Sequence, residues 1–151
     1  MMSTQAPPAG EESSGDALFD QMHEVMHLFR SRLREALRDE PDVLAAMEAR
    51  ALGFFARHDG AAQGDLVRHS GRDKGQVARL VRSLLDRGLL QRDAVAGRRG
   101  GLSLTAEGAA LHRRLQLQRA RLADELAGVL SADERARLGA LLRRLKASAE
   151  G

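Results

Sequence analysis

The amino-acid sequence predicts a mainly α-helical protein with one small β-hairpin, and two observations carry this prediction. Apolar residues recur at steps of three and four over most of the chain, which is typical of helices with one buried face. Residues 89–104 break this pattern with two short extended segments around a turn rich in glycine and arginine. A length of 151 residues favours one folded domain.

The first predicted helix begins near residue 16. Residues 1–15 are rich in Pro, Ser, Gly and Glu, cannot bury an apolar face, and are expected to form a flexible tail. Ser14 or Asp16 is placed to cap the helix that follows. We expect this helix to bury a face with three- and four-residue spacing, formed by Leu18, Phe19, Met22, Val25, Met26, Phe29, Leu33 and Leu37.

A second and a short third helix are expected next. Pro41 suits the first turn of the second helix, and residues 58–60 (His-Asp-Gly) end it. Leu66 and Val67 are the core positions of the third helix, which ends at residues 69–71 (His-Ser-Gly). The apolar set of the second helix is Val43, Leu44, Met47, Ala51, Phe54 and Phe55.

The fourth predicted helix has two distinct faces. It begins near Arg72 and ends at Gly88, because glycine readily adopts the backbone conformation that follows a helix C-terminus. Its apolar face repeats at helical spacing through Val77, Leu80, Val81 and Leu84. Its polar face carries Lys74, Gln76, Arg79, Arg82 and Ser83.

The hairpin follows this helix directly. Residues 89–95 form one extended segment, and residues 102–104 alternate like a strand with one buried face. The turn between them, residues 96–101, carries Arg98 and Arg99 among glycines. A basic-faced helix beside a hairpin with arginines at its tip is the outline of a winged helix-turn-helix. In that fold the helix enters the DNA major groove and the hairpin reaches the flanking backbone or minor groove.

Two long helices complete the chain. Thr105 is placed to cap the first of them, and Ser131 with Glu134 forms a capping box that starts the last. The apolar positions of the fifth helix are Leu111, Leu115, Leu122, Leu126 and Val129. Those of the sixth helix are Leu138, Leu141, Leu142 and Leu145.

Several classes of protein are disfavoured by composition. The chain has no cysteine, which excludes disulfides and thiol catalysis. It has no apolar run long enough to span a membrane and no pattern of a signal peptide, so a cytoplasmic protein is expected. No glycine-rich phosphate cradle and no acid pair beside a candidate base is recognisable. We therefore expect neither an enzyme nor a cofactor.

Charge is unevenly distributed along the chain. The formal net charge is only +3. Residues 1–48 hold 4 basic and 10 acidic side chains, whereas residues 68–99 hold 9 basic and 3 acidic ones. A local basic excess is expected of a surface that binds phosphates, although arginine is abundant throughout this chain.

The fourth helix and the hairpin tip are thus the candidate DNA-binding residues, the alternatives being a solvated helix face and a soluble turn. Gln76 can bond adenine in a bidentate way and Arg79 can bond guanine, whereas Lys74 and Arg82 suit phosphates. Gly75 permits close approach of the backbone to DNA. The full candidate set is Lys74, Gly75, Gln76, Arg79, Arg82, Ser83, Arg98 and Arg99.

The terminal helices point to assembly. They are long, amphipathic and without an obvious partner in a small winged domain. Packing against a second copy of the chain would bury their apolar faces, and packing on each other within one chain is the alternative. We predict a single domain over residues 16–151, with the winged helix-turn-helix at about 43–105 and dimerisation helices at about 16–38 and 106–148.

An ordered set of residues resembles the MarR family of bacterial winged helix-turn-helix transcriptional regulators across about residues 17–147. The matching residues are Asp73, Lys74, Val77, Arg79, Leu80, Val81, Leu84, Arg87, Gly88, Leu89, Leu90, Arg98, Arg99, Leu104, Thr105, Glu107 and Gly108. The resemblance implies a homodimer that binds pseudo-palindromic promoter DNA as a repressor and is released by a small ligand. It also implies that this ligand, often an aromatic acid, lies between the dimerisation region and the DNA-binding lobe.

Three departures from the family pattern stand out. Gly97 replaces an acidic residue that often precedes the two wing arginines and holds the first of them. Gly75 and Gln76 stand where the recognition helix usually begins with Ser or Thr. Ala61 and Ala62 stand where a polar cap is expected for the third helix.

One edge of the first helix is the candidate effector site. His23, His27, Arg30 and Arg34 follow one another at steps of four, three and four, and they could face a small anionic effector. Phe54 and Phe55 could supply apolar walls for an aromatic ligand, or belong to the core. Histidines at i and i+4 can share zinc, here with Glu107 and His112, but a polar margin of an interface explains them as well, and we assign no metal.

The expected function is a dimeric regulator that binds double-stranded DNA and responds to a small effector. Two alternatives stay open at this stage. A helical protein–protein interaction module, such as an anti-activator without DNA binding, would use the same amphipathic helices but would not need a basic wing. A zinc-responsive regulator would use the histidines.

Overall fold

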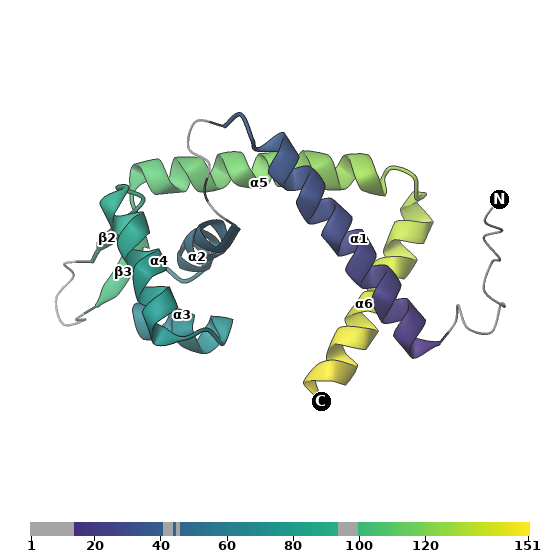
Figure 1. Cartoon of the computed structure of the whole chain (residues 1–151). Helices are drawn as coiled ribbons and strands as arrows, with labels where there is room; N and C mark the ends of the chain where they lie inside the picture. The colour runs from purple at the N-terminus through teal and green to yellow at the C-terminus, as the bar shows by residue number, and fades with distance from the viewer. Residues whose placement is uncertain (1–13, 41–43, 45, 94–99) are drawn as a thin grey trace, which may run out of the picture. The chain divides into compact units, whose positions relative to one another are not determined.

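The computed structural model describes residues 14–40, 44, 46–93 and 100–151 (Figure 1). These residues confirm the mainly α-helical class with a small antiparallel sheet. The elements are α1 (Gly15–Ala36), α2 (Ala46–Arg57), β1 (Ala61–Ala62), α3 (Gln63–Ser70), α4 (Lys74–Asp86), β2 (Leu90–Arg92), β3 (Gly101–Leu104), α5 (Ala106–Ala127) and α6 (Ala132–Glu150).

Contacts divide the chain into two compact units. One unit is Asp39–Arg119, which contains α2, the sheet, α3, α4 and the first part of α5. The other combines the described part of Met1–Arg38 with Ala120–Gly151, and so contains α1, the end of α5 and α6. Among the residues described, no helix has the length and apolar character needed to cross a membrane.

The helix-turn-helix consists of α3 and α4. Gly71 ends α3 in the left-handed conformation, with φ of 64°, which glycine adopts without steric cost. Asp73 caps α4 by accepting a hydrogen bond of 3.0 Å from the Gly75 amide. The two helices are therefore separated by a short, sharply defined turn, as the sequence predicts.

The sheet contains one strand that sequence analysis missed. Its order is β1-β3-β2, with Ala61 paired to Leu102 and Leu90 paired to Leu104. The central position of β3 makes the predicted single buried face wrong, since Ser103 is buried as well as Leu102. Ala61 and Ala62, which stand where a polar cap was expected, form the two-residue strand β1. The polar cap of α3 comes instead from Asp65, whose carboxylate accepts a 2.8 Å hydrogen bond from the Ala62 amide.

The core lies in the Asp39–Arg119 unit. The apolar side of α4 packs against α2, and α2 also packs against β3. Leu44, Ala51, Phe54 and Phe55 are buried as predicted, whereas Pro41 and Val43 lie outside the described residues. The largest completely buried side chains are Phe55, Leu52, Leu84, Leu102, Val77 and Val81.

The end of α4 and the start of α5 are tied together. After α4, Gly88 has φ of 69°, and the Leu89 amide donates back to the Leu84 carbonyl at 2.9 Å, which confirms the predicted glycine stop. Thr105 caps α5 as predicted, accepting from the Gly108 amide at 3.0 Å. The same hydroxyl donates to the Gly88 carbonyl at 2.6 Å. One threonine therefore joins the two helix ends.

The second unit leaves most of its apolar residues uncovered. Ser14 caps α1, and the Ser131–Glu134 capping box starts α6, both as predicted. The predicted burial of the α1 face is nevertheless wrong for the single chain, because Phe29 is its one buried residue among those described. Large apolar side chains are exposed at Leu18, Phe19, Val25, Met26, Leu126, Val129, Leu138, Leu141, Leu142 and Leu145.

Gly108 should be essential for folding. A Cβ atom at this position would lie 2.0 Å from the Leu89 carbonyl oxygen, a backbone atom that cannot move aside alone. We expect Gly108→Ala to lower the free energy of unfolding by roughly 3 kcal/mol or more, measured by urea denaturation. Gly64→Ala is the control, since its Cβ would lie 3.8 Å from the end of Arg68, and it should stay within about 1 kcal/mol of the wild type. Equal stabilities of the two variants would contradict this view of the α4–α5 junction.

Candidate nucleic-acid interface

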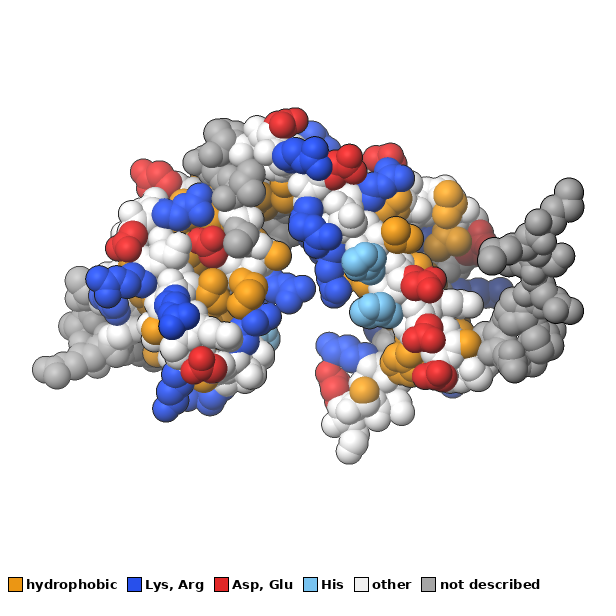
Figure 2. All heavy atoms as spheres, in the orientation of Figure 1, with side chains coloured by type: hydrophobic (Ala, Val, Ile, Leu, Met, Phe, Trp, Pro, Cys, Tyr) orange, Lys and Arg blue, Asp and Glu red, His pale blue; other side chains and the backbone are white. Residues whose placement is uncertain are grey.

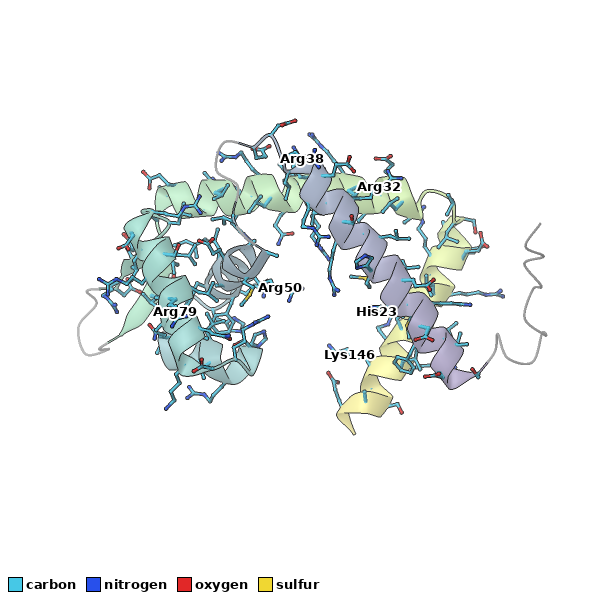
Figure 3. All side chains as sticks on the ribbon, in the orientation of Figure 1. His23, Arg32, Arg38, Arg50, Arg79 and Lys146 are labelled. Atoms are coloured by element: carbon cyan, nitrogen blue, oxygen red, sulfur yellow. The ribbon has the colours of Figure 1, made fainter. Side chains whose placement is uncertain are left out.

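The outer face of α4 is a continuous exposed surface. Burial of Val77, Val81 and Leu84 turns the opposite side of the helix to solvent. Figure 2 shows Lys and Arg side chains on this unit, and Figure 3 shows Arg79 on α4. The exposed candidates are Lys74, Gly75, Gln76, Arg79 and Arg82. Together they offer three cations and one amide, which suits phosphates and base edges.

Ser83 has a different environment from the other candidates on α4. It is only partly exposed, and its hydroxyl donates a 2.8 Å hydrogen bond to Glu48 Oε2 on α2. Arg87 Nη1 lies 3.5 Å from the same carboxylate oxygen. Sequence analysis missed Glu48, because a single acid in the first turn of a helix carries no local sign of a partner 35 residues away.

The described residues include the two strands of the wing but not its tip. Arg98, Arg99 and Val95 lie outside the described residues. The strands that lead to the tip are paired, with Arg92 opposite Leu102 and a 2.8 Å hydrogen bond from the Asp93 amide to the Gly101 carbonyl. Gly100, with φ of 96°, adopts a conformation that favours glycine.

α3 also carries a charged pair. Asp65 forms an ion pair with Arg68, one turn further along the helix. The pKa of the Asp65 carboxyl is held below its ordinary value, first by the Ala62 amide that it accepts from and then by Arg68. The Asp65 carboxylate therefore caps the N-terminus of α3. We assign it no role in binding a ligand.

The predicted effector residues are divided between the two units. His23, His27, Arg30 and Arg34 are exposed on α1. Phe54 and Phe55 belong to the Asp39–Arg119 unit, where they are 4% and 1% exposed. An open hollow of about 470 Å³ lies on α1, lined by Phe19, Asp20, Met22, His23, Met26 and Arg30. It brings His23 and Arg30 together with apolar side chains.

Three aromatic rings meet at the ends of α2 and α3. The Phe54 ring stacks on His58 at 4.5 Å between centroids and lies 5.1 Å from His69. His58 Nδ1 lies 3.1 Å from the Phe54 carbonyl oxygen. These contacts give both histidines a structural role at the helix ends. Across the part of the chain that is described, no group of three or more His, Cys, Asp or Glu side chains is arranged to hold a metal.

The environment of His112 disfavours its charged form. His112 lies on α5 beside α2, near Gly53. Burial lowers the pKa of His112 below its ordinary value of 6.5, and the nearby charge of Arg57 lowers it further. The neutral imidazole is therefore the form that the fold favours.

The α3–α4 pair and the three-stranded sheet with its hairpin define a winged helix-turn-helix protein. A model of the MarR family matches residues 44–100. The chain is similar to wild-type MarR from E. coli in its apo form, with 26% identity, a TM-score of 0.67, and coverage of 93% of this chain and 98% of that one.

Two further solved structures are similar. The PcaV transcriptional regulator from Streptomyces coelicolor, in complex with its natural ligand, has 27% identity and a TM-score of 0.63, over 96% of this chain and 99% of that one. A MarR family protein from Mycobacterium tuberculosis in complex with DNA shares the fold, with 21% identity and a TM-score of 0.70, over 93% and 98% of the two chains. No curated protein sequence matches this chain.

The family model and the solved structures agree with the helix order and the wing. The MarR family model covers the winged helix-turn-helix region of the chain, and the likeness to MarR and PcaV over nearly the whole chain supports a DNA-binding transcriptional regulator of this type. None of these matches indicates an enzyme family.

Stability should fall on mild acidification because of His112. The pKa of His112 is lower in the folded chain than in the unfolded chain, so the unfolded state binds the proton more readily. The contribution of His112 to the free energy of unfolding is complete above about pH 6.5, and it is lost as the pH falls through the lowered pKa. We expect His112→Gln to flatten the slope of unfolding free energy below pH 6.5. An unchanged slope in this variant would contradict the assignment, since Asp65 and Glu134, whose carboxyl pKa values are lowered, act at more acidic pH.

Arg79 and Arg99 should differ in how they affect DNA binding. If Arg79 contacts a base, Arg79→Ala should cost on the order of 1–3 kcal/mol and relax sequence preference at one position. Arg99→Ala should weaken binding to all sequences evenly and reduce the salt dependence, as expected of a phosphate contact. Fluorescence anisotropy over a set of single-base operator variants measures both effects. Wild-type affinity in two correctly folded variants would refute both roles.

Proposed function

We propose that this regulator is a homodimeric cytoplasmic repressor, which binds a pseudo-palindromic promoter site and is released by a small aromatic or other anionic ligand. The observation that carries the proposal is the pairing of two surfaces on one chain. One is the exposed basic face of α4. The other is the set of uncovered apolar side chains on α1 and α6.

The apolar surface supports the dimer. Phe19 is 61% exposed and Leu141 is 52% exposed, and α6 has no buried residue at all among those described. Soluble monomers rarely expose large contiguous apolar patches. A second copy of the same chain, related by a two-fold axis, would cover these faces without any other partner. These helices are the residues 16–38 and 106–148 that sequence analysis assigned to dimerisation.

A two-fold dimer has a direct consequence for DNA. It would present two α4 helices to successive major grooves, about 34–36 Å apart, which matches half-sites that are inverted copies of each other. In each half-site Gln76 and Arg79 would contact bases, and Lys74 and Arg82 would contact phosphates. Arg98 and Arg99 would extend the contact from the wing. Binding over a promoter would block transcription, hence the proposal of repression.

The α1 hollow is the proposed effector site. His23 and Arg30 could bond a carboxylate at the edge of the α1 face that the second copy covers, with Met22 against an apolar ring. PcaV, which is 27% identical to this chain, was solved with its natural ligand, which supports a ligand-binding function for this chain. Phe54 and Phe55 are not part of this proposal, because both are buried in the core of the other unit. Zinc, the alternative effector, would need ligands beyond His23 and His27.

Footprinting on the promoter beside the gene tests the dimer and its site together. We expect two protected half-sites about one helical turn apart, and an affinity that falls steeply with salt because several phosphates are neutralised. Sedimentation of the complex should give two chains per duplex.

Binding by a monomer, or a flat response to salt, would overturn the dimeric repressor. A protein that binds no DNA in a shift assay with bulk genomic competitor would instead fit the anti-activator alternative.

The effector is testable with aromatic carboxylates. A hundredfold loss of operator affinity requires a coupling free energy of about 2.7 kcal/mol between ligand and DNA. We expect calorimetry to detect binding of such an acid, and Arg30→Ala to abolish both binding and release of DNA. Arg32→Ala is the matched control, since Arg32 is exposed on the same helix but does not line the hollow (Figure 3). If neither an aromatic acid nor zinc displaces DNA at millimolar concentration, the α1 site is wrong.

A further inference from the structure

Glu48 connects the first turn of α2 to α4 at two points. The Ser83 hydroxyl donates to Glu48 Oε2 at 2.8 Å, and Arg87 Nη1 lies 3.5 Å from the same oxygen. The Glu48 side chain is only 16% exposed. A carboxylate held largely out of water needs such partners, because burying an unpaired charge is costly. We refer to Glu48, Ser83 and Arg87 as the α2–α4 clamp.

The clamp fixes the orientation of α4, which apolar contacts alone do not fix. Val77, Val81 and Leu84 hold α4 on the core, but apolar attraction has no preferred direction and tolerates small rotations of a helix. Hydrogen bonds weaken steeply when their angle is wrong. Ser83 lies in α4 and Arg87 is its C-cap residue, one helical turn later. A single carboxylate on α2 therefore restrains both the rotation of α4 and its sliding along its axis.

We propose that Glu48 is a positioning residue for sequence recognition, acting on DNA through α4. This inference rests on the proposed recognition of bases by α4. Gln76 and Arg79 can bond base edges only over a narrow range of helix orientations, because bidentate bonds have fixed geometry. Phosphate contacts made by long basic side chains tolerate small shifts. Loss of the clamp therefore lowers discrimination between DNA sequences more than it lowers general affinity for DNA.

Because Glu48 is negatively charged, a positioning role and a simple charge effect predict opposite changes in affinity for the preferred duplex when it is replaced. Removing an acid from a basic DNA-binding unit strengthens binding to every duplex if only net charge matters. Removing a positioning residue weakens binding to the preferred duplex while leaving the binding of other sequences equal or stronger. The ratio of the two affinities separates these cases.

The experiment begins with a duplex that the full-length wild-type protein selects from a random pool, compared with a scrambled duplex of equal length. We expect Glu48→Gln to reduce the affinity ratio by about five- to tenfold, with equal or stronger affinity for the scrambled duplex, and Ser83→Ala to reduce the ratio by a similar factor. Glu48→Gln keeps the size of the side chain, and circular dichroism at the assay temperature checks that each variant is folded. Asp86→Asn is the matched control, because it removes an exposed carboxylate of α4 outside the clamp and should keep the ratio.

A double-mutant cycle tests whether Glu48 acts through Ser83. The combined variant Glu48→Gln with Ser83→Ala should lose no more selectivity than either single variant, because the two residues act as one unit. Folded single variants that keep the wild-type ratio, or that lose affinity for both duplexes equally, overturn the positioning role. A wild-type protein that selects no duplex overturns the proposed DNA recognition, and this inference with it.

Discussion

Burial of one face of α4 against α2 and α3 is the interaction on which the other features of the DNA-binding unit depend. Each buried Val or Leu contributes on the order of 1.5–3 kcal/mol, and three of them line this face of a 13-residue helix. Because side chains three and four residues apart share one side of a helix, the same packing that anchors α4 exposes Lys74, Gln76 and Arg79. Anchoring and recognition are thus two sides of one amphipathic helix.

The position of α4 is also determined at its end. Gly88 turns the chain, Thr105 bonds the Gly88 carbonyl, and Gly108 lies against the Leu89 carbonyl. No side chain fits between Gly108 and Leu89, so the start of α5 follows the end of α4 as one rigid junction. α5 contributes to both compact units, since one unit ends at Arg119 and the other resumes at Ala120.

The two units differ in how completely they bury their apolar residues. The Asp39–Arg119 unit encloses a closed core around Leu52, Phe55 and Leu102. α1 and α6 form stable helices through their caps at Ser14 and Ser131, but their apolar residues stay uncovered in one chain. Forming a helix and burying its apolar face are separate requirements of a stable fold. In a single chain α1 and α6 meet only the first. That difference gives the proposed homodimer its physical basis.

The sequence by itself determined the helices, the caps of α1, α5 and α6 and the basic face of α4, because these depend on residues close together in the chain. Periodicity identified Val77, Val81 and Leu84 as the inner face, and the residue types at Asp73 to Gly108 carried the family resemblance. Only the tertiary structure decided the third strand, the burial of Ser103 and the pairing of Glu48 with Ser83. These depend on which distant segments meet: β1 is two alanines with no strand pattern of their own, and Glu48 finds its partner 35 residues away. Periodicity shows that a face is apolar, but what covers it is decided by the neighbours that folding or assembly brings to it.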